Sequence, residues 1–275
     1  MIYSGCWTGI AIVVVSILTA FALVSATRRL FPAEELQDGH DSTGGLLAIV
    51  GTLYAVLLGL IVVDAMIRFD KALDCVQMES NCLADIFLLA DGLPEPYRNN
   101  IQDACRTYAQ QVVDLEWPQM ERARMSVEAR MTALKLAQSL RSFEPLTEAH
   151  KIIYPSLLEQ IRELWDRRRD RGCTAEYGIP VVEWVALVVG AAVTLFLGSL
   201  LHVGSRRLKL VVTSMTALVI GLNLYLICLF GYPFAGELSV SNRPFRVDVA
   251  IFDEVHEHAA AHAGELHGSP AAKAP

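Results

Sequence analysis

Four long apolar blocks constrain the fold of this chain more than any other feature of its sequence. They span residues 7–26, 44–67, 178–201 and 210–230, and each is nearly free of charged residues. A helix needs about 20 such residues to cross a bilayer, because each residue advances it by about 1.5 Å. Inside lipid every backbone amide must be bonded within its own segment, so runs of this kind are helical. We therefore predict four transmembrane helices.

The composition excludes an ordinary soluble protein. Of the 275 residues, 53% are hydrophobic and only 19% are charged, and the net charge of −7 comes without a dense basic patch. The sequence contains no nucleophile elbow, no phosphate-binding loop and no Cys–His pair suited to catalysis. We expect no enzymatic activity, no cofactor, no metal site and no nucleic-acid partner.

Four spans place both termini and residues 68–177 on one side of the membrane. Nine Lys and Arg residues flank the spans on that side, and five flank them on the other. The positive-inside rule therefore places residues 68–177 and both termini in the cytoplasm. A cleaved signal peptide is the alternative for residues 7–26, but the basic residues follow that block instead of preceding it.

Residues 68–177 are predicted to form a helical cytosolic domain. Apolar or small residues recur with helical spacing from Phe69 to Ala90, so the second span is expected to continue into water as one helix, with Glu79 facing solvent or a partner's polar rim. Further helices are expected over residues 96–117, 124–143 and 147–171. Such stripes expose more apolar surface than one subunit can cover, which predicts a homo-oligomer.

The remaining segments complete the predicted organisation. Residues 1–67 hold the first two spans, residues 178–231 hold the last two, and residues 232–275 form a C-terminal segment. The last 25 or so residues are rich in Ala, His, Gly and Pro, so we expect a disordered tail. Zinc binding by His258 and His262, which would share a helix face, is the alternative.

Several short strings resemble one known family. They are residues 50–59 (VGTLYAVLLG), 92–96 (GLPEP), 108–113 leading into 116–118 (EWP), and 232–236 (YPFAG). Together they resemble bacterial bestrophin-like four-span membrane proteins over roughly residues 1–250. True bestrophins are pentameric anion channels with four spans and a cytosolic helical domain between the second and third. The resemblance therefore implies an all-α, pentameric channel fold in the bacterial inner membrane.

One face of the second span carries the candidate channel residues. Spacings of 3, 4, 3 and 4 along a helix bring together Tyr54, Leu57, Ile61, Asp64 and Arg68. By resemblance to bestrophins this face lines the pore, with Leu57 and Ile61 as a hydrophobic constriction and Arg68 at the cytoplasmic mouth. In the alternative interpretation Asp64 pairs with Arg68 at the membrane surface and nothing permeates.

Other polar residues have structural interpretations. Glu183 and Asn223 lie within the third and fourth spans, where each is expected to hydrogen-bond to another helix. The basic run at residues 167–171 (RRRDR) suits lipid phosphate, an acidic surface of a neighbouring subunit, or simple orientation of the third span.

Two classes of function remain from the sequence. The first is an oligomeric ion channel lined by the second span. The second is a non-conducting membrane scaffold or sensor whose cytosolic helical domain binds other proteins. Membrane lipid is an expected partner in both.

Overall fold

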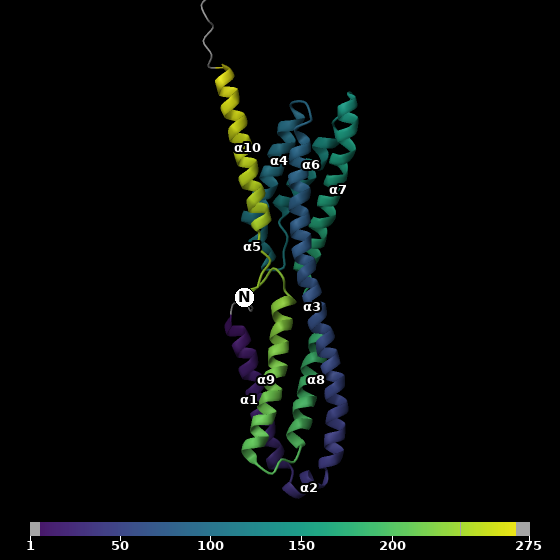
Figure 1. Ribbon diagram of the computed structural model, residues 1–275, viewed down its shortest axis with the longest axis vertical. Helices are drawn as coiled ribbons and strands as arrows, with labels where there is room; N and C mark the ends of the chain where they lie inside the picture. Colours follow the sequence, from purple (N-terminus) through teal and green to yellow (C-terminus); the bar gives the residue numbers. More distant parts are fainter. Residues whose placement is uncertain (1–5, 237, 268–275) are drawn as a thin grey trace, which may run out of the picture. The chain divides into compact units, whose positions relative to one another are not determined.

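The structure, a computed structural model, describes residues 6–236 and 238–267, and these form helices joined by short connections (Figure 1). The predicted all-α class is confirmed, since no strand occurs within the described ranges. The chain divides into two compact units. Unit 1 comprises Met1–Lys71 and Tyr177–Ser239, and unit 2 comprises Ala72–Glu176 and Val240–Pro275.

Unit 1 contains the apolar helices. Its elements are α1 (Cys6–Leu30), α2 (Ala33–Asp38), the first part of α3 (His40–Ala90), α8 (Val181–Leu200) and α9 (Arg206–Phe230). Four stretches among the described residues contain a helix long and apolar enough to cross a membrane: Trp7–Leu30, His40–Ala90, Glu148–Leu200, whose apolar helix is α8, and Arg206–Phe230. The four apolar blocks of the sequence fall within these stretches, except that the third block ends one residue later, at Leu201.

Small residues let the helices of unit 1 pack closely. Helices α1 and α9 run antiparallel side by side (Figure 1), and a Cβ atom on Gly221 of α9 would lie 3.2 Å from the Cα of Val13 on α1. On α8, a Cβ atom on Gly190 would lie 2.3 Å from the Tyr54 ring of α3. Because lipid supplies little hydrophobic drive for helix association, such close packing is what holds membrane helices together.

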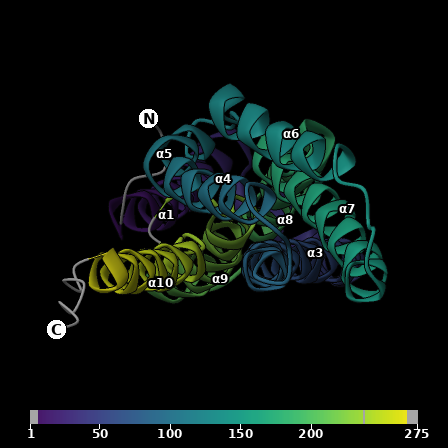
Figure 2. The ribbon, with the colours of Figure 1, turned by 90° about the horizontal axis from the view of Figure 1, so that it is seen from above.

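Unit 2 contains the rest of α3 and most of the charged helices. Its other elements are α4 (Tyr97–Gln111), the π-helical turn η1 (Val112–Glu116), α5 (Trp117–Met120), α6 (Val127–Arg141), α7 (Glu148–Glu176) and α10 (Arg243–His267). Helix α4 contacts both α6 and α10 and lies between them (Figure 2). Apolar side chains with no solvent exposure fill the core of unit 2: Leu83, Ile86, Ile101, Leu136, Leu157 and Leu164.

The prediction that the second span continues as one helix is confirmed, because α3 is unbroken over 51 residues. The later part of its predicted stripe is buried, including Val76, Leu83 and Phe87, although Leu73 is 43% exposed. The expected helix over 96–117 is instead divided into α4 and η1, with α5 following it.

The expectation of disorder from about residue 251 is wrong for the first part of that segment. Helix α10 continues through it, because Phe252 is buried and stacks on Phe87 of α3 with the ring centroids 4.1 Å apart. Asp253 pairs with Arg106 of α4. The side chains of residues 259–267, including His262, and all of residues 268–275 lie outside the described part, so the predicted tail there stays a prediction.

Candidate functional site

The five residues predicted to share one face of α3 occupy two different environments. Tyr54 and Ile61 are 6% and 7% exposed and pack in the core of unit 1 with Leu187 and Ala191 of α8. The Tyr54 hydroxyl donates a hydrogen bond to the Leu187 carbonyl, 3.1 Å away. These two side chains are therefore covered within a single subunit.

The other three predicted residues lie at the edge of the exposed surface of α3. Leu57 is partly buried, and the Asp64 and Arg68 side chains are 50% and 33% exposed. Arg68 Nε donates to Asp64 Oδ2 over 2.6 Å, one helical turn away. The ion pair of the alternative interpretation is thus present, and it neutralises both charges locally.

The outer surface of α3 in unit 1 is apolar along its length. Large apolar side chains that are each at least 45% exposed recur there every three or four residues: Leu46, Ile49, Leu53, Val56, Leu60, Val63 and Ile67. We call this set the outer face of α3. Soluble monomers rarely expose a continuous apolar surface of this size, so this surface suits lipid, a second subunit or a dewetted pore.

Among the described residues, Glu183 and Asn223 form no side-chain hydrogen bond to another helix, contrary to the prediction. Asn223 Nδ2 donates to the Val219 carbonyl of its own helix at 2.9 Å. Glu183 lies in the first turn of α8, and its buried Oε2 atom has no hydrogen-bond partner in the described part of the chain. Its position at a helix N-terminus is electrostatically favourable for a carboxylate.

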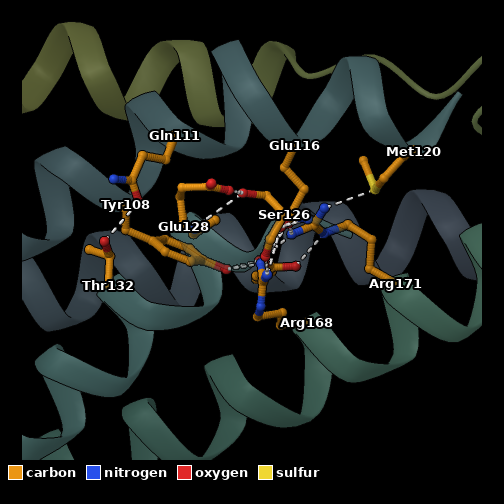
Figure 3. A network of polar contacts seen from close by, with 11 residues as sticks. Tyr108, Gln111, Glu116, Met120, Ser126, Glu128, Thr132, Arg168 and Arg171 are labelled. Carbon is orange, nitrogen blue, oxygen red and sulfur yellow. Dashed lines mark hydrogen bonds and ion pairs between the residues drawn. The ribbon is translucent and has the colours of Figure 1, made fainter. Parts of the chain in front are cut away.

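A buried polar arrangement lies in the core of unit 2. We call it the buried ionic cluster, and Figure 3 shows most of its members. Its charged side chains are all at most 5% exposed and come from α3, η1 and α7: Glu79, Glu116, Arg168 and Arg171. The Tyr108 hydroxyl of α4 joins them by donating to Glu79 Oε1.

Arg171 connects the two carboxylates of this cluster. Its Nε and Nη2 atoms donate to the two Glu79 oxygens over 2.6 and 2.8 Å, and Nη2 also donates to Glu116 Oε1 over 2.6 Å. The guanidinium carbon lies 5.8 Å from the ring centroids of both Trp117 and Phe245. The remaining Nη1 atom of Arg171 lies 3.0 Å from the Met120 sulfur.

Arg168 holds Glu116 through two parallel bonds. Its Nη1 and Nη2 atoms donate to Glu116 Oε1 and Oε2 over 2.5 and 2.6 Å, the bidentate geometry that planar guanidinium groups favour. The backbone N–H of Ser126 donates to Glu116 Oε2, and the Ser126 carbonyl accepts from Arg168. The cluster therefore contains two negative and two positive charges, and each charged group forms an ion pair with another member.

The charges also fix the ionisation of the cluster. Burial alone would raise the pKa of Glu116, but Arg171 and Arg168 outweigh burial and hold that pKa below its usual range. Burial raises the pKa of the Tyr108 phenol, and the negative charge of Glu79 raises it further. Both arginines keep raised pKa values in spite of burial because they face these acids. The cluster is thus a neutral clamp between α3 and α7, in which each of the four charged side chains has an ion-pair partner.

The sequence predictions for two parts of this cluster are wrong. The sequence places Glu79 toward solvent or a partner's polar rim, and it assigns the basic run at 167–171 to lipid phosphate, an acidic neighbouring surface or orientation of the third span. Glu79, Arg168 and Arg171 are instead buried, whereas the Arg169 side chain is 72% exposed. A signal for this was present. Arg168 and Arg171 continue the stripe of Leu157, Ile161 and Leu164 with spacings of 4 and 3 residues, which places both arginines on the buried face of α7.

The comparisons with known proteins identify the family. The family described as Bestrophin-like domain matches residues 14–245. The chain belongs to the bestrophin-like family. A search of curated protein sequences finds no significant match to this bestrophin-like chain.

Solved structures confirm the bestrophin fold. A variant of a bacterial bestrophin homolog from Klebsiella pneumoniae matches with a TM-score of 0.65 and 12% identity, covering 89% of this chain and 97% of its own. The crystal structure of that homolog solved by zinc phasing matches with a TM-score of 0.62 and 14% identity, covering 87% and 95%. At this level of identity the likeness concerns the fold alone.

A buried acid of this bestrophin-like protein predicts a pH-dependent stability. Asp248 of α10 is 6% exposed, and its Oδ2 accepts a 2.5 Å hydrogen bond from the Ser80 hydroxyl of α3. Burial raises the pKa of Asp248 from 3.8 to about 6, and the Ser80 bond offsets only part of this shift. The folded protein therefore binds this proton more tightly than the unfolded chain, so stability falls as pH rises from about 4 to about 6.

We expect Asp248→Asn to stabilise the protein at pH 7.5 by about 1 kcal/mol, because the amide carries no charge to bury and still accepts from Ser80. Thermal unfolding in detergent measures this, and the gain should vanish below about pH 4. The control is Asp253→Asn on the same helix, which removes the carboxylate charge of a partly exposed ion pair with Arg106 and should give no gain. A gain that is equal at every pH would contradict the assignment.

Proposed function

We propose that this chain is the subunit of a homo-oligomeric, bestrophin-like ion channel of the bacterial inner membrane, with its pore lined by α3. The outer face of α3 is the observation that carries the proposal, because one subunit leaves it uncovered. Membership of the bestrophin-like family and the fold shared with the Klebsiella homolog support it. A pentamer is the proposed assembly, by analogy with true bestrophins.

In the proposed topology α1, α3, α8 and α9 cross the membrane, and unit 2 lies in the cytoplasm with both termini. The length and apolarity of the four helical stretches and the excess of basic residues on one side of the spans support this placement. The buried ionic cluster then lies outside the bilayer, where it holds the cytosolic continuation of α3 against α7.

The burial of Tyr54 and Ile61 refines the choice of pore residues. Their neighbours in sequence, Leu53 and Leu60, are 67% and 66% exposed and fall on the same side of α3 as Leu57, Asp64 and Arg68. We propose that these five line the pore, with Leu57 and Leu60 forming an apolar constriction. Tyr54 and Ile61 then support this wall from behind through their contacts with α8.

The Asp64–Arg68 ion pair sets the expected selectivity. A lone carboxylate in the pathway would oppose anions, but Arg68 neutralises it at a distance of 2.6 Å. Removing the carboxylate would leave the guanidinium charge uncompensated. The Asp64 carboxylate therefore reduces the preference of the pore for anions over cations.

We expect liposomes containing the purified oligomer to show ion flux, and Leu60→Ala to raise that flux several-fold by widening the constriction. The particle mass in nanodiscs is measured first, so that the flux belongs to a defined oligomer. Asp64→Asn should shift the permeability ratio towards anions. Ile61→Ala should change conductance less than Leu60→Ala does, because Ile61 is covered by α8.

The matched control is Leu18→Ala on α1, a leucine that is 59% exposed on another apolar helix and should leave the flux unchanged. Equal effects of Leu18→Ala and Leu60→Ala would overturn the assignment of α3. Absence of flux from a verified oligomer, in every variant and with several salts, would overturn the channel itself and favour a membrane scaffold.

A further inference from the structure

An apolar groove runs between α1 and α9 in unit 1. Its volume is about 580 Å³, and the side chains that line it are Ile17 and Phe21 of α1 together with Arg207, Leu210, Val211, Ser214, Met215 and Leu218 of α9. Several of these are well exposed, with Met215 at 65%. Apart from Arg207 and Ser214 the lining is entirely apolar, which fits a hydrocarbon chain better than any polar ligand.

Positive charge gathers at one end of this groove. Helices α1 and α9 are antiparallel, so the last turn of α1 lies at the same end as the first turn of α9 (Figure 1). Arg28 and Arg29 occupy the last turn of α1, and Arg206 and Arg207 occupy the first turn of α9. None of these four arginines has an ion-pair partner among the described residues, although the short helix α2 nearby in sequence carries Glu34 and Glu35.

The surrounding groups do not neutralise this charge. Lys209, in the first turn of α9, is only 3% exposed, and no ion pair of its ammonium group is found in the described part of the chain. Basic residues in the first turn of α9 also oppose the helix dipole, whose positive end lies there. These unpaired basic residues would be stabilised by an anion bound at this end of the groove.

We infer that the groove binds an anionic phospholipid, with one acyl chain along α1 and α9 and its phosphate at Arg207. The inference rests on the proposed membrane placement of unit 1. Arg207 suits this role because its aliphatic stem covers apolar surface while its guanidinium group reaches the headgroup level. Phosphatidylglycerol is preferred over phosphatidylcholine because the unpaired arginines at this end attract a net negative headgroup.

The test counts lipids bound to the full-length oligomer by native mass spectrometry, with phosphatidylglycerol and phosphatidylcholine as probes. We expect phosphatidylglycerol to bind more tightly, by about fivefold for each basic residue near the headgroup. Arg207→Gln should reduce the preference for phosphatidylglycerol over phosphatidylcholine by about fivefold. Ser214→Phe, which fills the groove without changing its charge, should weaken the binding of both lipids.

The control is Arg122→Gln, which removes an exposed arginine of unit 2 and should leave the preference unchanged. An unchanged preference in Arg207→Gln would overturn the inference, and so would full competition by soluble glycerol phosphate, which would indicate a free-anion site. Flux from the same preparations separates the two proposals. Flux without lipid preference refutes the lipid site alone, and lipid preference without flux refutes the channel alone.

Discussion

Arg171→Ala is expected to destabilise unit 2 by about 3 to 5 kcal/mol, the usual cost of removing one partner from a buried ion pair. Arg171 is fully buried, and its loss leaves Glu79 without a cation and Glu116 with only Arg168. The melting temperature in detergent should fall by about 10 °C or more. The fluorescence of Trp117, which lies 5.8 Å from the guanidinium group, reports the change.

Arg169→Ala is the matched control for this prediction. Arg169 lies on the same helix, but its side chain is 72% exposed and its contact with Asp166 is long, at 3.7 Å. Exposed pairs of this kind contribute about 0 to 1 kcal/mol, so little change is expected. Adding Glu79→Gln to Arg171→Ala should recover part of the loss, because it removes the unpaired charge. Equal stability of the two single variants would refute the clamp.

Gly190→Ala is expected to destabilise unit 1 by about 1 to 3 kcal/mol through overpacking. The added methyl group would lie 2.3 and 2.6 Å from two carbons of the Tyr54 ring. That ring is buried and is held by its bond to the Leu187 carbonyl, so it cannot move without losing the bond. Since Tyr54 fixes α3 against α8, the variant should lower both the melting temperature and any ion flux.

Gly198→Ala tests whether this effect is specific to the contact. Gly198 lies on the same helix, but nothing lies within 4 Å of the position that its Cβ atom would take. Alanine is a better helix former than glycine by about 0.5 to 1 kcal/mol, so this variant should melt at the same or a higher temperature. A similar loss in both variants would indicate a general intolerance of α8 to substitution.

Much of the fold could be predicted from the sequence, because the membrane leaves few choices. Nearly uncharged runs of about 20 residues allow only helices in lipid, and the four predicted blocks lie in helices of the structure except at residues 178–180 and 201. The continuation of α3 followed from apolar spacing, which does not depend on partners. The ion pair between Asp64 and Arg68 could be predicted for the same reason, since residues four apart on a helix are neighbours.

The candidate site was harder to predict from the sequence, because periodicity shows which residues share a helix face and does not show what covers that face. The stripe of Tyr54 and Ile61 is one such case, since α8, which covers it, lies more than 100 residues further along the chain. The charged residues of the buried ionic cluster are another. Glu79 and Arg171 are separated by 92 residues. Because Glu and Arg side chains are usually exposed, their burial could not be predicted without knowing that they pair.

The π-helical turn at Val112–Glu116 sets the rotation of Glu116 about the helix axis relative to α4. Val112, Glu116 and Met120 are all buried at intervals of four residues. In a regular α-helix each such step rotates the side chain by about 40° beyond a full turn, so Glu116 would drift away from the arginines. The wider turn absorbs that drift. Deletion of one residue from this turn would rotate Glu116 out of the core and away from the two arginines. In an alignment of relatives, a one-residue gap at this turn would therefore indicate that the buried ionic cluster is lost or rearranged.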